Sequence, residues 1–227
     1  GVLRITEVAP WSSGNSAVAA DWFEVTNIGA RAVNVTGWKM DDGSETPASA
    51  VALNGISSIA PGESVIFIET ADLPGKSALF KTTWFGANPP AGLQIGSYNG
   101  GGVGLSTGGD AVNLFDTTSP TPVRRANVSF GIAPSSAPFG TFDNTAAADL
   151  ASVTLKSVPG VNGAFVAANS TNEFGSPGSA IPGGPLDFAL WLAANGYTSS
   201  GFGADGDNDG VTDGVEFFFN QNPNNGG

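Results

Sequence analysis

Short segments in which apolar and polar residues alternate constrain the fold of this chain more than any other feature. This alternation has the period of a β-strand with one buried face. Turn sequences such as Asn27-Ile28-Gly29 and Ala60-Pro61-Gly62 separate the segments, and no segment with helical periodicity lies between them. The pattern therefore favours a β-sandwich or barrel over an α/β fold. It predicts strands at residues 3–8, 21–26, 33–40, 63–69, 111–115 and 123–130.

The pattern loosens after residue 130, where prolines interrupt any long element. Up to residue 180 we expect long loops with one or two strands. A Pro/Gly-rich linker follows, and then an apolar-faced segment at 186–195 that predicts a helix ending at Gly196. The expected organisation is a β-domain at 1–180, a linker at 181–185, a helix with an acidic loop and a short exit helix at 186–223, and a flexible tail at 224–227.

The residues that are missing exclude several classes of function. The chain of 227 residues has no His and no Cys, which excludes Ser-His and Cys-His relays, thiol nucleophiles, zinc clusters and disulfides. Eight Lys and Arg against 20 Asp and Glu give a formal charge of -12, so a basic groove for nucleic acid is not expected. No apolar stretch reaches the 18 residues that would predict a membrane span.

The acidic loop carries the most specific motif of the chain. Residues 205–216 match the twelve-residue pattern D-x-[DN]-x-[DN]-G-x5-E at every position. Such a loop surrounds Ca²⁺ with hard oxygen ligands, and a glycine at position six permits the sharp turn. The predicted ligands are Asp205, Asp207, Asp209, the Val211 carbonyl, Asp213 and Glu216. The simpler alternative is a solvated acidic turn.

The residues before this loop are glycine-rich, so no helix is expected to lead into it. The tail is therefore similar to the single-loop calcium repeats of dockerin type, and to the acidic loops that end many exported bacterial proteins. Dockerins carry two such loops and this chain carries one, which argues against cohesin-type docking.

Four strings in the first 65 residues resemble one family when taken together. They are Leu3-Arg4-Ile5-Thr6-Glu7-Val8, Asp21-Trp22-Phe23-Glu24-Val25-Thr26-Asn27, Val33-Asn34-Val35-Thr36-Gly37-Trp38 and Ile59-Ala60-Pro61-Gly62-Glu63-Ser64. In this order they resemble the lamin tail domain, and the likeness extends to about residue 180. The resemblance implies a mainly β fold, an immunoglobulin-like β-sandwich. The small α-helical calcium-binding appendage predicted from the acidic loop follows this sandwich at the C-terminus. It also implies a non-enzymatic module of the bacterial exported type, and so an extracellular or cell-surface location.

Two features could be read as catalytic sites. Residues 104–108 match G-x-S-x-G, but they lie in a glycine-rich segment and the chain has no His. Glu7 and Glu24 could face each other on adjacent strands, as the carboxylates of a glycosidase do, although a structural or hydrogen-bonding role is the alternative. The sequons at Asn34, Asn127 and Asn169 are possible glycosylation sites of an exported protein.

Two functions remain open from the sequence. The first is a non-catalytic structural or adhesive protein, whose calcium-braced sandwich associates with other copies of itself or with extracellular matrix. The low share of charged residues, 12%, favours this function, because subunits with few charges can approach one another with little electrostatic repulsion. The second is a polymer-binding accessory module of an exported enzyme, for polysaccharide or in a nuclease or phosphatase context. Trp11, Trp84, Phe85 and Tyr98, expected in loops, would then form a platform for stacking on sugar rings.

Overall fold

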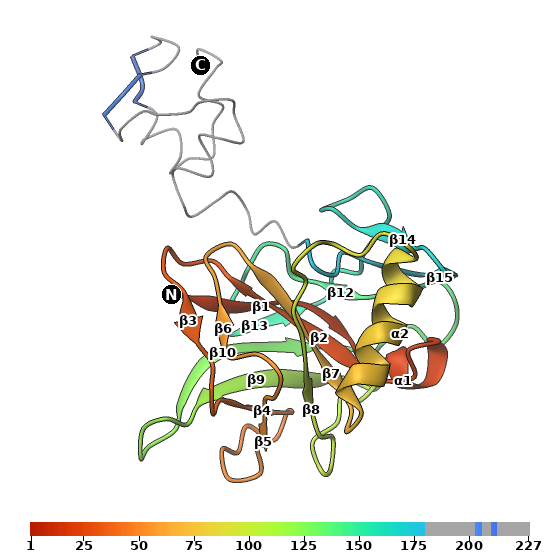
Figure 1. The fold of residues 1–227 in the computed structure, drawn as a ribbon, viewed down its shortest axis with the longest axis horizontal. Coiled ribbons are helices and arrows are strands. Elements are labelled where there is room, and N and C mark those ends of the chain that lie inside the picture. The colour runs from red at the N-terminus through yellow and green to blue at the C-terminus, as the bar shows by residue number, and fades with distance from the viewer. Residues whose placement is uncertain (180–202, 206–209, 213–227) are drawn as a thin grey trace.

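Two five-stranded sheets pack face to face, because the long strands place apolar side chains on one face of each sheet (Figure 1). The computed structural model describes residues 1–179, 203–205 and 210–212. The first sheet has the strand order β12-β1-β2-β7-β8. Its strands are β1 (Leu3–Ala9), β2 (Trp22–Asn27), β7 (Ser64–Glu69), β8 (Ile95–Tyr98) and β12 (Phe142–Asp143).

The second sheet has the order β13-β10-β9-β4-β5. It comprises β4 (Lys39–Asp41), β5 (Val51–Ala52), β9 (Asp110–Asp116), β10 (Val123–Phe130) and β13 (Ala151–Val153). Antiparallel pairing dominates both sheets, with β7–β8 and β10–β13 as parallel pairs.

Smaller elements complete the described part of the chain. A three-stranded sheet joins β11 (Phe139–Gly140), β15 (Ser170–Gly175) and β14 (Phe165–Ala167), and a two-stranded one joins β3 (Val33–Asn34) and β6 (Ser58–Ile59). The helices are α1 (Ser12–Asn15) and α2 (Leu73–Phe85). Figure 1 shows the C-terminal end of α2 beside β14.

Helix α2 covers the face of the first sheet that is turned away from the second sheet. Its N-cap Asp72 accepts a hydrogen bond from the Gly75 N–H at 3.1 Å, and a proline occupies the first turn, as helix starts favour. Phe80 and Trp84 of the helix pack edge-on against Trp22 of β2, with ring centroids 5.3 and 5.5 Å away. An aromatic layer thus lies outside the sandwich, and Phe165 of β14 extends it.

The core between the two sheets is formed by the opposite faces of the same strands. Phe23 of β2 packs on Phe67 and Tyr98, at centroid distances of 5.6 and 5.5 Å. Because side chains alternate along a strand, Phe23 points inward while its neighbours Trp22 and Glu24 point outward. The outward face of β2 is therefore also fully buried.

The structure confirms five of the six predicted strands and corrects several details. The segment 33–40 forms two short strands because a turn closed by the Trp38 N–H and the Val35 carbonyl interrupts it. Residues 70–104, between predicted strands where no helix was expected, contain α2. Residues 131–179 contain five short strands where one or two were expected. The predicted helix at 186–195 and the linker at 181–185 lie outside the described residues.

We expect α2 to be essential for stability through its buried rings. Phe80→Ala removes a fully buried ring and is expected to lower the free energy of unfolding by about 3–5 kcal/mol. The neighbouring Leu79→Ala, at a side chain that is 39% exposed, is expected to cost less than about 1 kcal/mol. Urea denaturation measures both, and equal losses would contradict the packing of α2 described above.

Candidate functional site

Three acidic side chains lie in one row across neighbouring strands of the first sheet. In the strand register Asp143 of β12 pairs with Glu7 of β1, and Glu7 pairs with Glu24 of β2. A bulge in β1 between Ile5 and Glu7 adds Thr6 to the same polar region. All three carboxylates are buried, and within the described residues none of them forms an ion pair with Lys or Arg.

Glu7 holds the end of the described β-domain. Its carboxylate accepts hydrogen bonds from the Ser176 backbone N–H at 2.8 Å and from the Thr141 hydroxyl. The backbone at Gly175 passes directly over Glu7, and a Cβ there would lie only 2.4 Å from the Glu7 Oε1 atom. Only glycine permits this close approach.

Glu24 holds the same segment two residues further along. Its Oε2 accepts the Gly178 backbone N–H at 2.6 Å, and its Oε1 accepts the Thr6 hydroxyl at 2.6 Å. From Thr6 a row of hydroxyl groups continues through Thr26 to Ser64 with spacings of 2.8 and 2.7 Å. We call Glu7 and Glu24, with the segment 175–178 that they hold, the carboxylate clasp.

Burial and mutual repulsion favour the protonated forms of the clasp. Burial, and next the charge of Glu24, raise the pKa of Glu7 well above its ordinary value. Burial, and to a lesser extent the charge of Asp143, raise the pKa of Glu24 to about 7, although hydrogen bonds from Thr6 and Gly178 lower it. The two neighbouring carboxyl groups titrate as a coupled pair, and the pKa of each is shifted towards its protonated form.

The expectation that Glu7 and Glu24 face each other is confirmed, and their contacts give them a structural role. Both side chains have 0% exposure, so in this structure a substrate has no access to them. Their hydrogen-bonding capacity is directed to the backbone and hydroxyl groups around them. The clasp can therefore fix chain segments and respond to protons.

Ser106 lies in an exposed loop between β8 and β9 and not in a strand-to-helix turn. Its hydroxyl accepts the Gly108 backbone N–H at 3.1 Å, and its own backbone N–H donates to Asp110. The G-x-S-x-G match is thus a hydrogen-bonded loop without the geometry of a nucleophile elbow.

The proposed aromatic platform is wrong. Trp11, Trp84 and Tyr98 are 0 to 1% exposed, and only Phe85 reaches the surface in part. Trp11 stacks on Phe139 and donates its indole N–H to the Gly140 carbonyl. Trp84 and Tyr98 belong to the core because α2 and β8 occupy the segment that was read as loop. Trp11 is buried just before α1.

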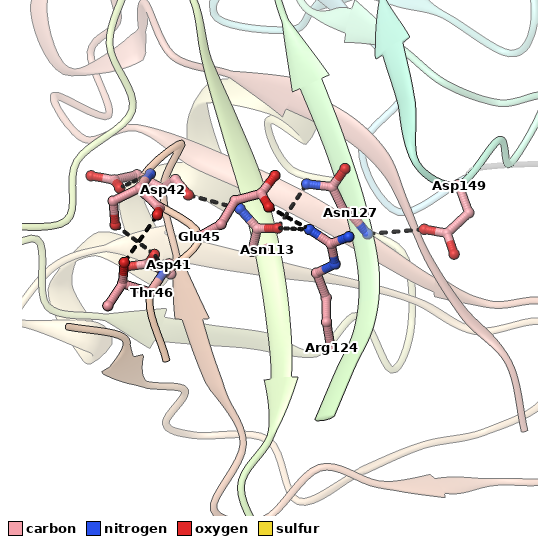
Figure 2. Close-up of polar contacts among 9 residues, drawn as sticks. Asp41, Asp42, Glu45, Thr46, Asn113, Arg124, Asn127 and Asp149 are labelled. Carbon is pink, nitrogen blue, oxygen red and sulfur yellow. Dashed lines mark hydrogen bonds and ion pairs between the residues drawn. The ribbon is translucent and has the colours of Figure 1, made fainter. Parts of the chain in front are cut away.

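A second polar network holds the outer face of the second sheet (Figure 2). Asn127 donates to Asn113 at 2.7 Å, and Asn113 donates to the Asp42 carbonyl at 2.7 Å. Arg124 bridges from Asn113 to Glu45. Asn127 is 8% exposed and sits inside this network, which excludes glycosylation there in the folded protein, whereas Asn34 and Asn169 are exposed.

Of the predicted calcium ligands, Asp205 and Val211 are described, and Asp207, Asp209, Asp213 and Glu216 lie outside the described residues. The Gly210 backbone N–H donates to the Asp205 carboxylate at 3.0 Å. The motif therefore remains a prediction from the sequence.

The clasp makes the stability of the protein depend on pH. Because the folded-state pKa of Glu24 is about 7 against an ordinary value of 4.5, folding favours its protonated form. The resulting stabilisation is full below pH 4.5 and is lost as pH rises through 7. The wild-type free energy of unfolding is expected to fall across this range, and Glu24→Gln is expected to flatten the fall.

Urea denaturation at several pH values measures this effect. Glu63→Gln, at a half-exposed residue just before β7, serves as the charge-matched control and is expected to retain the wild-type slope. Parallel curves for the wild type and Glu24→Gln would contradict the protonation of the clasp.

Comparison with known proteins assigns the family. The family model of the Lamin Tail Domain matches residues 1–130, which is more than half of the chain. The resemblance inferred for residues 131–180 lies outside this match. No curated protein and no solved structure matches the chain significantly. No helix among the described residues is long and apolar enough to cross a membrane. The mainly β fold is compatible with a non-catalytic structural module, and the chain belongs to the lamin tail domain family.

Proposed function

We propose that this protein is a non-catalytic structural subunit, exported to the cell surface or beyond it. We further propose that its lamin tail domain associates with other copies and that its C-terminal loop binds Ca²⁺. The observation that carries the structural role is the carboxylate clasp: the most strongly perturbed acidic pair has 0% exposure and is occupied by the protein's own backbone. A general acid or base would need contact with a substrate.

Two facts about the described part of the loop support calcium binding. Gly210, at position six of the motif, has a φ of +95°, the left-handed conformation that a sharp turn requires. Its N–H donates to Asp205 at position one, which draws the start of the loop towards its middle. A cation would also relieve the repulsion among five carboxylates within twelve residues.

We expect isothermal titration calorimetry of the full chain to detect one Ca²⁺ site. Glu216→Gln removes the bidentate ligand and is expected to abolish the binding, because a neutral amide replaces two carboxylate oxygens. Asp149→Asn in the β-domain removes the same charge outside the loop and is expected to leave calcium affinity unchanged. Equal affinity in all three proteins would contradict the predicted site.

The surface beyond residue 130 supports self-association. Five aliphatic side chains there are at least half exposed: Ile132, Leu150, Leu155, Val158 and Val161. Lys156 donates to the Ile132 carbonyl at 3.4 Å, so Ile132 lies beside the Leu155–Lys156 segment. Exposed aliphatic groups on a surface with few charges can associate with little cost in electrostatic repulsion.

The strand edges offer less to a partner than this surface. The outermost strands of the two large sheets are short: β12 and β5 have two residues, β13 has three and β8 has four. Asn54 also pairs with Ser97 of β8. Association by strand pairing is therefore restricted, and we place the contact on side chains.

Light scattering over a range of protein concentrations, with Ca²⁺ and then with EGTA, tests the association. Assemblies are expected with Ca²⁺ and are expected to weaken in EGTA, because an ordered tail would brace the subunit. Leu155→Lys is expected to dissociate them, whereas Val123→Lys, at an exposed aliphatic residue on β10, serves as the control. A wild-type protein that is monomeric at every concentration with Ca²⁺ would refute self-association.

A further inference from the structure

A pocket lies at one end of the space between the two large sheets, where β1 begins and β9 ends. It has a volume of about 460 Å³, which is within the range of small-ligand sites. Its lining includes Val2, Val33, Asn34, Trp38, Asp116 and Arg125. Alternation along β9 places Asp116 on the same face as the core residues Val112 and Leu114. The pocket therefore belongs to the inner side of the sandwich, away from the carboxylate clasp.

One carboxylate at this pocket holds the guanidinium of Arg125 in place. The Arg125 Nε and Nη2 atoms both donate to the Asp116 Oδ2 atom, at 3.2 and 2.8 Å. The other oxygen of Asp116 accepts the hydroxyl and the backbone N–H of Thr118, at 2.6 and 3.1 Å. Hydrogen bonds from Thr118 and Arg125 lower the pKa of Asp116, so this group stays ionised. Its two oxygens each accept two hydrogen bonds, which uses their capacity.

Arg125 still has N–H groups to offer to a ligand. A guanidinium carries several N–H donors in one plane, and Asp116 engages only its Nε and Nη2 atoms. Within the described ranges the Nη1 atom has no hydrogen-bond partner. The side chain is 48% exposed, so solvent and ligands reach it. Because one side is fixed by Asp116, the remaining N–H groups point in a defined direction.

The indole N–H of Trp38 is a second unused donor. Trp38 is 5% exposed and belongs to the core between the sheets, yet no described residue accepts a hydrogen bond from its Nε1 atom. The fully enclosed polar atoms without a partner in the described part of the chain belong to Ser12, Trp22, Trp84 and Tyr98. The Trp38 nitrogen is not one of them, so solvent reaches it. The small exposed part of Trp38 therefore includes its N–H group, in a side chain that lines the pocket.

Asn34 of β3 supplies a third donor. Its Oδ1 atom accepts the Thr36 backbone N–H at 2.9 Å, whereas its Nδ2 atom has no partner among the residues that the structure describes. The side chain is exposed. The unused side-chain groups at the pocket are thus N–H donors, and the carboxylate of Asp116 has no capacity left for a ligand.

A carboxylate is the ligand group that suits such a site, because it accepts hydrogen bonds and donates none. Val2 and Val33 add aliphatic walls beside the donors. A sugar acid combines a carboxylate with ring C–H groups, which pack on aliphatic side chains, and with hydroxyl oxygens that accept further N–H groups. We propose that the pocket binds a uronate unit of an acidic polysaccharide. Its carboxylate lies on Arg125, and its other oxygens face the N–H groups of Trp38 and Asn34.

Two related ligands fit less well. The C-terminus of a polypeptide carries an amide N–H next to its carboxylate, and the side chains of the pocket offer no free acceptor for it. A neutral sugar has only hydroxyl oxygens, which accept weaker hydrogen bonds from a guanidinium than a carboxylate does. The formal charge of -12 repels any anion at long range, so binding must come from the contacts in the pocket. This binding site is separate from the self-association surface beyond residue 130.

Nuclear magnetic resonance titration of the full chain with methyl β-D-glucuronide at pH 7 tests the proposal. Saturable shifts are expected at residues around the pocket. Methyl β-D-glucoside, which lacks the carboxylate, is expected to bind at least about tenfold more weakly. Arg125→Gln is expected to weaken glucuronide binding by a similar factor. Arg124→Gln is the matched control, because this neighbouring arginine pairs with Glu45 on the outer face of the second sheet.

A second variant leaves the ion pair intact. Val2→Trp, at a side chain that is 41% exposed, places a large ring at the pocket and is expected to block binding. Unchanged affinity in Val2→Trp would exclude this location, also where Arg125→Gln fails to fold. Equal affinity for the glucuronide and the glucoside, or equal affinity of Arg125→Gln and Arg124→Gln, would overturn recognition of the carboxylate. Tighter binding of Nα-acetyl-alanine than of the glucuronide would overturn the assignment to a sugar acid.

Discussion

The backbone N–H of Ser176 donates a hydrogen bond to the carboxylate of Glu7, and that of Gly178 donates one to the carboxylate of Glu24. Much of the architecture depends on this contact because it joins the first two strands to the end of the described β-domain. Between these points the chain lays β12 beside β1 and adds the three-stranded sheet with β15. The clasp thus anchors residues 131–179, which lie outside the family match, onto the lamin tail core.

The clasp is also an energetic compromise. Removing carboxylates from water is costly, and two adjacent ones repel each other. The protein reduces this cost with hydrogen bonds from N–H and hydroxyl donors and by favouring protonation. Apolar residues at these positions would avoid the desolvation but would leave the N–H groups of Ser176 and Gly178 without acceptors. Buried carboxylates therefore suit a place where a chain segment without regular pairing must be held.

The sequence predicted those parts of the fold that are encoded locally. Alternation is a property of five or six consecutive residues, so the long strands such as β1, β9 and β10 were predictable. Helix α2 was not predicted because apolar residues such as the exposed Leu79 lie off its buried face and weaken the helical periodicity of the sequence. Asp72 and Pro74 are nevertheless typical of a helix start. The two-residue strands after residue 130 are too short to carry a pattern.

The candidate sites were predictable only in part for the same reason. Glu7 and Glu24 could be placed opposite each other from two strand patterns, but their partner Ser176 lies 169 residues from Glu7, and no local signal indicates that contact. Tyr98 and Trp84 were expected in loops because α2 and β8 were not identified.

The distance along the chain between Glu7 and Ser176 has a consequence for biosynthesis. At translation rates of about 5–20 residues per second, the ribosome delivers the segment that covers Glu7 and Glu24 roughly 10 to 30 s after the first strand. During this interval the carboxylates of Glu7 and Glu24 lack the N–H groups of Ser176 and Gly178. A nascent chain can therefore pair its early strands and add α2, but it cannot cover this part of the sheet. The protein must therefore reach its native state late in synthesis or after release, and chaperones have that time to bind it.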